Sequence, residues 1–101
     1  MLLHTEEFVT DNVGQPEPVT VTRRCTRVVI QEQSQTGTAD FWIYGVTSAG
    51  TPDSNPAKYA AGKQKEFVAP PGHGFYAGQT IAFIAAASGS LTMSREEYGH
   101  P

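Results

Sequence analysis

The stretch IAFIAAASGSLTMSREE, residues 81–97, decides which class of fold the chain can adopt. Its apolar part, 81–87, has seven residues, whereas a membrane-spanning helix needs roughly 20. The run ends at SGS, and beyond it Leu91 and Met93 alternate with polar residues, which is the period of a strand. The stretch therefore predicts a closing hairpin of two strands, whose alanines allow a neighbour to pack closely against the sheet.

The composition indicates the same class of fold. A chain of 101 residues suits one domain, and 10 Gly, 7 Pro and a charged fraction of 17% are typical of turn-rich β architecture. The net charge of −3 argues against nucleic acid as a partner. The densest basic cluster is interpreted as a solvated sheet face or as partners of acidic neighbours; it consists of Arg23, Arg24 and Arg27.

Cys25 is the only cysteine of the chain, so no disulfide can form within it. This usage suits a protein made in a reducing cytosol. We expect the thiol to be buried as a small hydrophobic group, because it has no cysteine partner and no nearby histidine.

The chain divides into two parts at a pair of prolines. Residues 1–18 hold few periodic apolar positions and end in VGQPEP, which predicts an N-terminal arm or an edge segment that lies on its own domain or reaches a neighbour. Residues 19–101 are expected to form a single antiparallel β-sandwich or jelly roll of about six to eight strands. The strand-like segments are 19–33, 38–46, 63–69 and the two of the opening stretch, with a long loop at 47–62 and a glycine-rich turn at 70–79.

The aromatic strand FWIY, residues 41–44, is bulky on both sides, so both of its faces should be covered. We assign Phe41, Ile43 and Phe83 to the interior. If the register shifts by one residue, Trp42 and Tyr44 take their place.

The sequence contains no arrangement of residues that indicates catalysis or metal binding. His4, His73 and His100 lie far apart and have no second ligand at the spacing that zinc sites use. The carboxylate pairs 6–7 and 96–97 point to opposite faces of a strand, so they are interpreted as solvated charges. Nucleophile and phosphate-loop motifs are absent from the sequence. We therefore expect no enzyme, no cofactor and no metal.

Exposed aromatic side chains are the better candidates for contacts with a partner. Tyr59 lies in the long loop, and Phe75 and Tyr76 lie in the glycine-rich turn. Clustered aromatics of this kind are common anchors in protein interfaces. In the N-terminal segment, Phe8 and Val9 complete the predicted set of partner-contacting residues.

The order of these elements resembles the small β-sandwich virion proteins of tailed bacteriophages. Members of that group have a V-x-I-Q strand, a turn with glycine, an aromatic-rich strand, a strand after P-G, and a closing I-x-x-I-A-A-S-G segment. The resemblance covers roughly residues 25–97. Its matching residues are Val28, Ile30, Gln31, Thr36, Gly37, Gly62, Phe67, Ile81, Ile84, Ala85, Ala86, Ser88 and Gly89.

The resemblance implies a capsid decoration (cement) protein, a head fibre or a tail-associated adaptor, made in the bacterial cytoplasm; a decoration protein would bind the outer surface of the capsid. Its partners would be the major capsid protein and further copies of itself, as a homotrimer or homodimer. It would stabilise the shell against the pressure of packaged DNA, without a membrane or nucleic acid as a partner. The alternative is a tail-fibre, receptor-binding or carbohydrate-binding module, in which loop aromatics stack on sugars.

Overall fold

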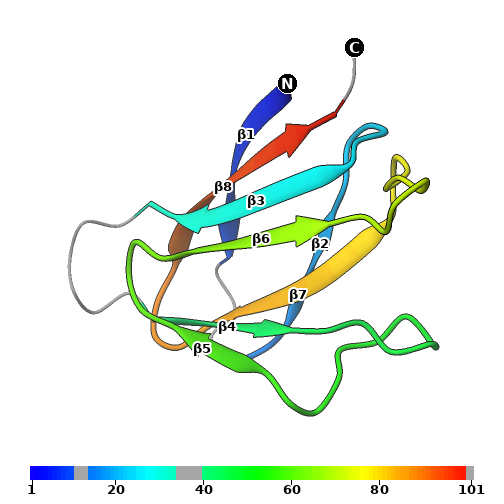
Figure 1. Ribbon diagram of the computed structural model, residues 1–101. Coiled ribbons are helices and arrows are strands. Elements are labelled where there is room, and N and C mark those ends of the chain that lie inside the picture. The colour runs from blue at the N-terminus through cyan, green and yellow to red at the C-terminus, as the bar shows by residue number, and fades with distance from the viewer. Residues whose placement is uncertain (11–13, 34–39, 100–101) are drawn as a thin grey trace.

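The computed structural model describes residues 1–10, 14–33 and 40–99. These residues form eight strands in two antiparallel sheets of four and contain no helix, so no helix of the described chain could cross a membrane (Figure 1). The strands are β1 (Leu2–Thr10), β2 (Glu17–Thr20), β3 (Arg27–Glu32), β4 (Phe41–Tyr44), β5 (Ala57–Tyr59), β6 (Gln64–Val68), β7 (Thr80–Ala86) and β8 (Leu91–Tyr98). The predicted turn at 34–37, with Thr36 and Gly37, and His100 lie outside the described residues.

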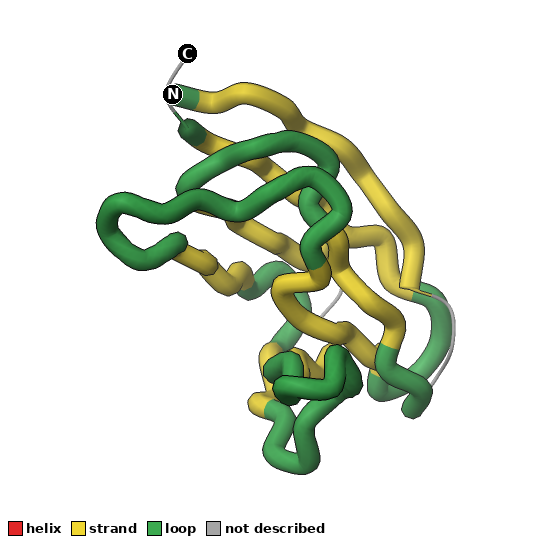
Figure 2. Tube along the Cα trace, turned by 90° about the vertical axis from the view of Figure 1, so that its right-hand side faces the viewer, coloured by secondary structure: helices red, strands yellow, loops and turns green. Residues whose placement is uncertain are grey.

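The first sheet has the strand order β1-β8-β3-β6, and the second has the order β2-β7-β4-β5. The tube view in Figure 2 shows strands and connecting loops only. An all-β sandwich was predicted from the period-two patterns, and this prediction is confirmed.

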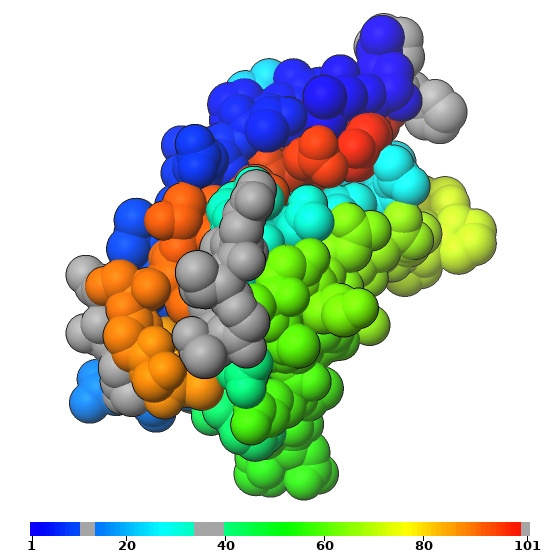
Figure 3. Space-filling model, turned by 90° about the vertical axis from the view of Figure 1, so that its left-hand side faces the viewer, coloured from blue at the N-terminus to red at the C-terminus, as the bar shows by residue number. Residues whose placement is uncertain are grey.

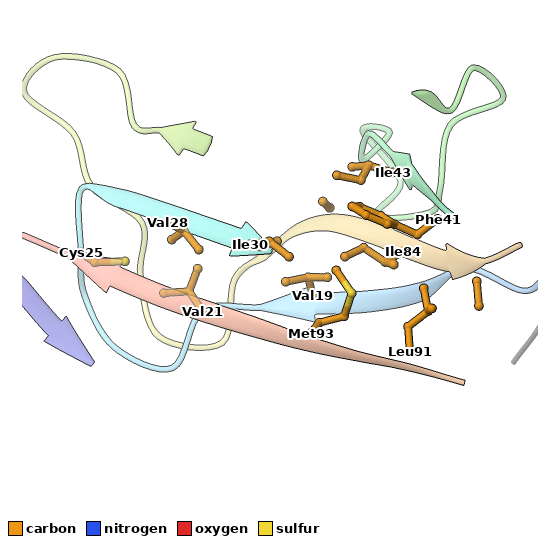
Figure 4. Close-up of a cluster of buried hydrophobic side chains, with 12 residues drawn as sticks. Val19, Val21, Cys25, Val28, Ile30, Phe41, Ile43, Ile84, Leu91 and Met93 are labelled. Atoms are coloured by element: carbon orange, nitrogen blue, oxygen red, sulfur yellow. The ribbon is translucent and has the colours of Figure 1, made fainter. Parts of the chain in front are cut away.

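The hydrophobic core lies between the two sheets (Figure 4). Alternate residues of each strand supply it, because successive side chains of a strand point to opposite faces. Each fully buried aliphatic or aromatic side chain contributes about 1.5–3 kcal/mol relative to exposure. The core consists of Val19, Val21, Cys25, Val28, Ile30, Phe41, Ile43, Ala82, Ile84, Ala86, Leu91 and Met93.

The two strands of the stretch 81–97 are present, but they do not form a hairpin. β7 pairs with β2 and β4, whereas β8 pairs with β1 and β3. The turn therefore carries the chain from one sheet to the other, with Gly89 at a φ of 75° that favours glycine. The hairpin prediction was wrong because a hairpin and a crossover between facing sheets show the same alternation of apolar residues.

The first segment of the chain lies on its own domain. β1 pairs with β8 along its length, with one irregularity between Leu2 and His4. It is the outer strand of the first sheet, which is the edge placement considered for residues 1–18. β2 contains Pro18 and is likewise an outer strand, as a residue without an N–H requires.

The aromatic strand β4 presents alternate residues to the two faces of the second sheet. Phe41 and Ile43 face the core, as predicted, and Trp42 and Tyr44 are half-buried on the outer face. Phe83 is buried too, but it pairs with Tyr44 and lies between two core residues of β7, so it points to the outer face. Its assignment to the interior is confirmed, although it is buried on the face of β7 that points away from the core cluster, because β7 is covered on both sides.

The region 47–62, predicted to be a loop, contains the short strand β5, which pairs with β4. In the segment 19–33, β2 ends at Thr20 and β3 begins at Arg27 in the opposite sheet. Both segments are thus divided by turns that the residue pattern did not locate.

Candidate functional site

The five predicted contact residues lie in three separate places. Phe8 and Val9 are on β1, and Phe75 and Tyr76 precede β7. Tyr59 is on β5, where its ring stacks on Phe41 with centroids 5.3 Å apart. Val9 and Tyr76 are 58% and 64% exposed, whereas the other three are partly buried against the core. The structure therefore brings Phe75 and Tyr76 together but separates them from the rest.

An open groove with both polar and apolar residues in its wall lies between β6 and the beginning of β7, and Phe75 is part of this wall. Its volume is about 530 Å³. It is lined by Val46, Lys65, Glu66, Phe67, Val68, Phe75, Gln79, Thr80 and Ile81.

Phe75 is held in place by backbone hydrogen bonds rather than by a regular strand. Its N–H donates to the Cys25 carbonyl over 2.8 Å, and the Cys25 N–H donates back over 3.2 Å. A Cβ on Gly74 would lie 3.2 Å from the Cys25 carbonyl oxygen, so glycine permits this close approach. The glycine-rich turn is therefore fastened to the chain between β2 and β3.

The exposed apolar surface around this groove extends beyond Phe75. Val68 is 63% exposed at the end of β6, and Val46 is exposed just after β4. The loops after β4 and β6 leave the sandwich at the same end (Figure 1). We call Val46, Val68, Phe75 and Tyr76 the loop-end surface. The sequence did not predict that Val46 and Val68 belong to this surface, because a single apolar residue at the end of a strand shows no pattern that separates an exposed side chain from a buried one.

A charged cluster is formed around Arg95 and Glu97 of β8, on the face of the first sheet that also carries Leu91 and Met93. Glu97 is fully buried and accepts hydrogen bonds from the Thr22 N–H, over 2.7 Å, and from the Thr22 hydroxyl. Arg95 donates to Glu6 and its Nε lies 3.9 Å from a Glu97 carboxylate oxygen. The Nε of Arg23 lies 3.7 Å from the other Glu97 oxygen. These contacts connect β1, β8 and the turn that follows β2.

This cluster corrects the interpretation of both carboxylate pairs as solvated charges. Glu97 is buried, and Glu6, although 47% exposed, is tied to Arg95. The alternation of Leu91, Met93, Arg95 and Glu97 could have placed Glu97 on the core face. The hydrogen bond from Arg95, and a weaker one from His4, lower the pKa of Glu6.

Two further pockets, smaller than the groove, lie elsewhere on the described chain. A cleft of about 340 Å³ between β1 and β2 is lined by Phe8, Val9 and Arg95, among others. A second pocket of similar volume has Arg24 and His73 in its wall. Within the described residues, Arg24 forms no ion pair, whereas Arg23 and Arg27 pair with Glu97 and Glu66. The expectation of acidic partners for the basic cluster is thus met for two of its three members.

The described residues contain no group of three or more His, Cys, Asp or Glu side chains that could hold a metal ion. Cys25 is buried, as predicted. Burial raises the pKa of its thiol, and the charge of Glu97 adds to this shift. The thiol is therefore held in its protonated form, which is a poor nucleophile.

Comparison with known proteins finds no family model and no curated protein that matches this chain.

Proposed function

We propose that this protein is a capsid decoration protein of a tailed bacteriophage, which binds the outer surface of the major capsid shell and stabilises it. The single structural observation in support is the loop-end surface, with its exposed apolar side chains, beside an open groove. Exposed apolar side chains around a groove are typical of protein-contact sites. The order of strand motifs, which resembles small virion β-sandwiches, supplies the rest of the argument.

Hydrogen bonds hold the backbone around Phe75 in place, so a partner could bind this surface without a large change in the conformation of the turn. The glycine-rich turn is tied to Cys25, and the Tyr76 N–H donates a hydrogen bond to Oε1 of the Gln79 side chain over 3.1 Å. A partner that covers Val68 and Tyr76 would remove two large exposed apolar side chains from water. At about 25 cal/mol per Å² of apolar area, such burial favours association.

The test is a sedimentation assay with empty capsids of the phage that encodes the chain. We expect the purified protein to sediment with the capsids and to raise their melting temperature. The double variant Val68→Asp with Tyr76→Ala should reduce binding by at least about tenfold, because each tenfold step corresponds to only 1.4 kcal/mol.

Val9→Asp is the matched control, since Val9 is similarly exposed but lies on β1. It should bind capsids like the unmodified protein. A protein that neither sediments with capsids nor raises their melting temperature would overturn the proposal. Glycan binding that depends on Tyr76, without capsid binding, would replace it with the carbohydrate-binding alternative.

A further inference from the structure

The two outer strands of the first sheet have free edges that can be located from the hydrogen-bond ladder. The Glu32 N–H donates to Lys63 O over 3.1 Å, and the Ala69 N–H donates to Thr26 O over 2.9 Å. In an antiparallel ladder, alternate residues direct their backbone groups to the same neighbour. Positions 63, 65, 67 and 69 therefore face β3, and the backbone groups of Gln64 and Glu66 point outward from β6.

The outward-pointing backbone groups of β1 can be found in the same way. The Gln33 N–H donates to Thr92 O over 2.9 Å, so the even-numbered residues of β8 face β3 and the odd-numbered ones face β1. Their partners on β1 have even numbers, from His4 to Thr10. The backbone groups of Thr5 and Glu7 consequently point outward. No other strand of the described chain pairs with either free edge.

We propose that the free edge of β6 pairs with the free edge of β1 in a second copy of this chain. Each strand in the order β1-β8-β3-β6 runs antiparallel to its neighbour, so β1 and β6 run in opposite directions. A copy placed head to tail thus continues the sheet in the antiparallel sense. Figure 3 shows the two strands at opposite sides of this sheet, with β8 and β3 between them.

Charge selects both the partner and the register. Lys65 lies opposite Ile30 on the inward face of β6, and within the described residues it forms no ion pair. Glu6 lies on the inward face of β1, and 47% of its side chain remains exposed beside Arg95. Pairing Glu66 with Thr5 of the second copy sets Lys65 opposite Glu6 and Gln64 opposite Glu7. A shift by two residues in one direction would place Glu66 opposite Glu7, which is repulsive, and a shift by two in the other would set Lys65 opposite His4 and so lose its pairing with Glu6.

Symmetric pairing of two β6 edges is less favourable. Centred on Glu66, it sets two glutamates against each other and Lys65 against Phe67. Centred one residue earlier, it sets two copies of Lys65 against each other. Pairing of unlike edges is heterologous, so it builds a closed ring or an open chain rather than a simple dimer.

This contact does not depend on capsid binding. It takes the backbone edge at positions 64–66, whereas the loop-end surface begins at Val68, although Lys65 and Glu66 also line the groove beside that surface. The test uses purified protein without capsids, so its result reports on self-association alone, and the sedimentation assay reports on capsid binding.

The test is oxidative crosslinking of the double variant Thr5→Cys with Glu66→Cys. A hydrogen-bonded antiparallel pair has a Cα separation of about 5.5 Å, which lies in the range that a disulfide spans. Mild oxidation over a concentration series should produce covalent species larger than a dimer. Cys25 is buried and common to all variants, so it does not distinguish them.

The two single variants are the controls. Glu66→Cys alone crosslinks only if two β6 edges meet, and Thr5→Cys alone only if two β1 edges meet. We expect neither to form covalent dimers at the rate of the double variant. Absence of species beyond a dimer from the double variant, or equal crosslinking of a single variant, would overturn the proposal.

A second experiment blocks the free edge of β6 with a proline and needs no crosslink. The outward N–H of Glu66 serves no bond within the sheet, so Glu66→Pro removes a donor only from the free edge. Light scattering should show monomers for Glu66→Pro and multimers for Glu66→Ala, although both lose the ion pair with Arg27. Equal masses for the two variants would contradict the pairing.

Discussion

The two outer strands of the first sheet differ in how firmly the rest of the molecule holds them. β1 has nine residues, and its inward side chains contact Arg95 and the core. β6 has five residues, of which only Phe67 is partly buried. The difference shows that strand length and one buried charged side chain fasten the N-terminal segment, whereas β6 remains largely exposed.

The largest loss of stability is expected when the buried carboxylate of the charged cluster, Glu97, is removed. Glu97→Ala leaves Arg95 and the Thr22 N–H without their buried partner. Removal of one member of a buried pair costs roughly 3–5 kcal/mol, and urea unfolding should show a loss of this size. Glu96→Ala, on the outward face of the same strand, should change the free energy of unfolding by less than about 1 kcal/mol. Equal losses for the two variants would contradict a special role of Glu97.

The next largest effect is expected for the aromatic residue of β1. Phe8 packs against the core and lies beneath the Arg95 guanidinium, 5.5 Å from its ring centre. Because Phe8 is only partly buried, Phe8→Ala should cost about 2 kcal/mol, below the 3–5 kcal/mol of a fully buried phenylalanine. Phe67→Ala on β6 is the matched variant, and it should cost less because no cation among the described residues lies over its ring. A larger loss for Phe67→Ala in urea unfolding would reverse the comparison.

Acid should weaken the attachment of β1 more than that of β6. The pKa of Glu6 is lowered in the folded state, so its contribution is present above the ordinary glutamate value of 4.5 and is lost as the pH falls through the folded pKa. Between pH 6 and pH 3 the unmodified protein should therefore lose more stability than Glu6→Gln. Hydrogen exchange of the β1 amides should rise in the same interval. Parallel stability curves for the two proteins would argue against this contribution.

The smallest effects on stability are expected for substitution of the exposed valines on the two outer strands. Val9→Asp and Val68→Asp should each change the free energy of unfolding by no more than about 0.5 kcal/mol, because both side chains are largely in water. Under the proposed function, only Val68→Asp should weaken capsid sedimentation. Equal binding by the two variants would show that the open end of β6 is not the contact surface.

Much of the fold could be predicted from local patterns. The alternation after Gly89, the β-branched residues of β3 and the aromatic alternation of β4 each indicated a strand, and the structure confirms them. The same patterns could not place β7 and β8 in different sheets, because the side-chain period is identical in both arrangements. The candidate surface was predicted only in part, since Tyr59 stacks on Phe41 and Val68 was not selected.

The sequence by itself determined that the chain is all-β and that alternate residues of the strand 41–44 face the core, because period-two burial is a local property of a strand. It also favoured a buried thiol, since Cys25 has no partner in the sequence. That Phe41 and Ile43, rather than Trp42 and Tyr44, face the core was decided by the tertiary structure. The tertiary structure alone decided which strands are neighbours, which strands are left with free edges, and why Glu97 is buried. These outcomes depend on contacts between residues far apart in the chain, such as Glu97 with Thr22, and no local pattern encodes them.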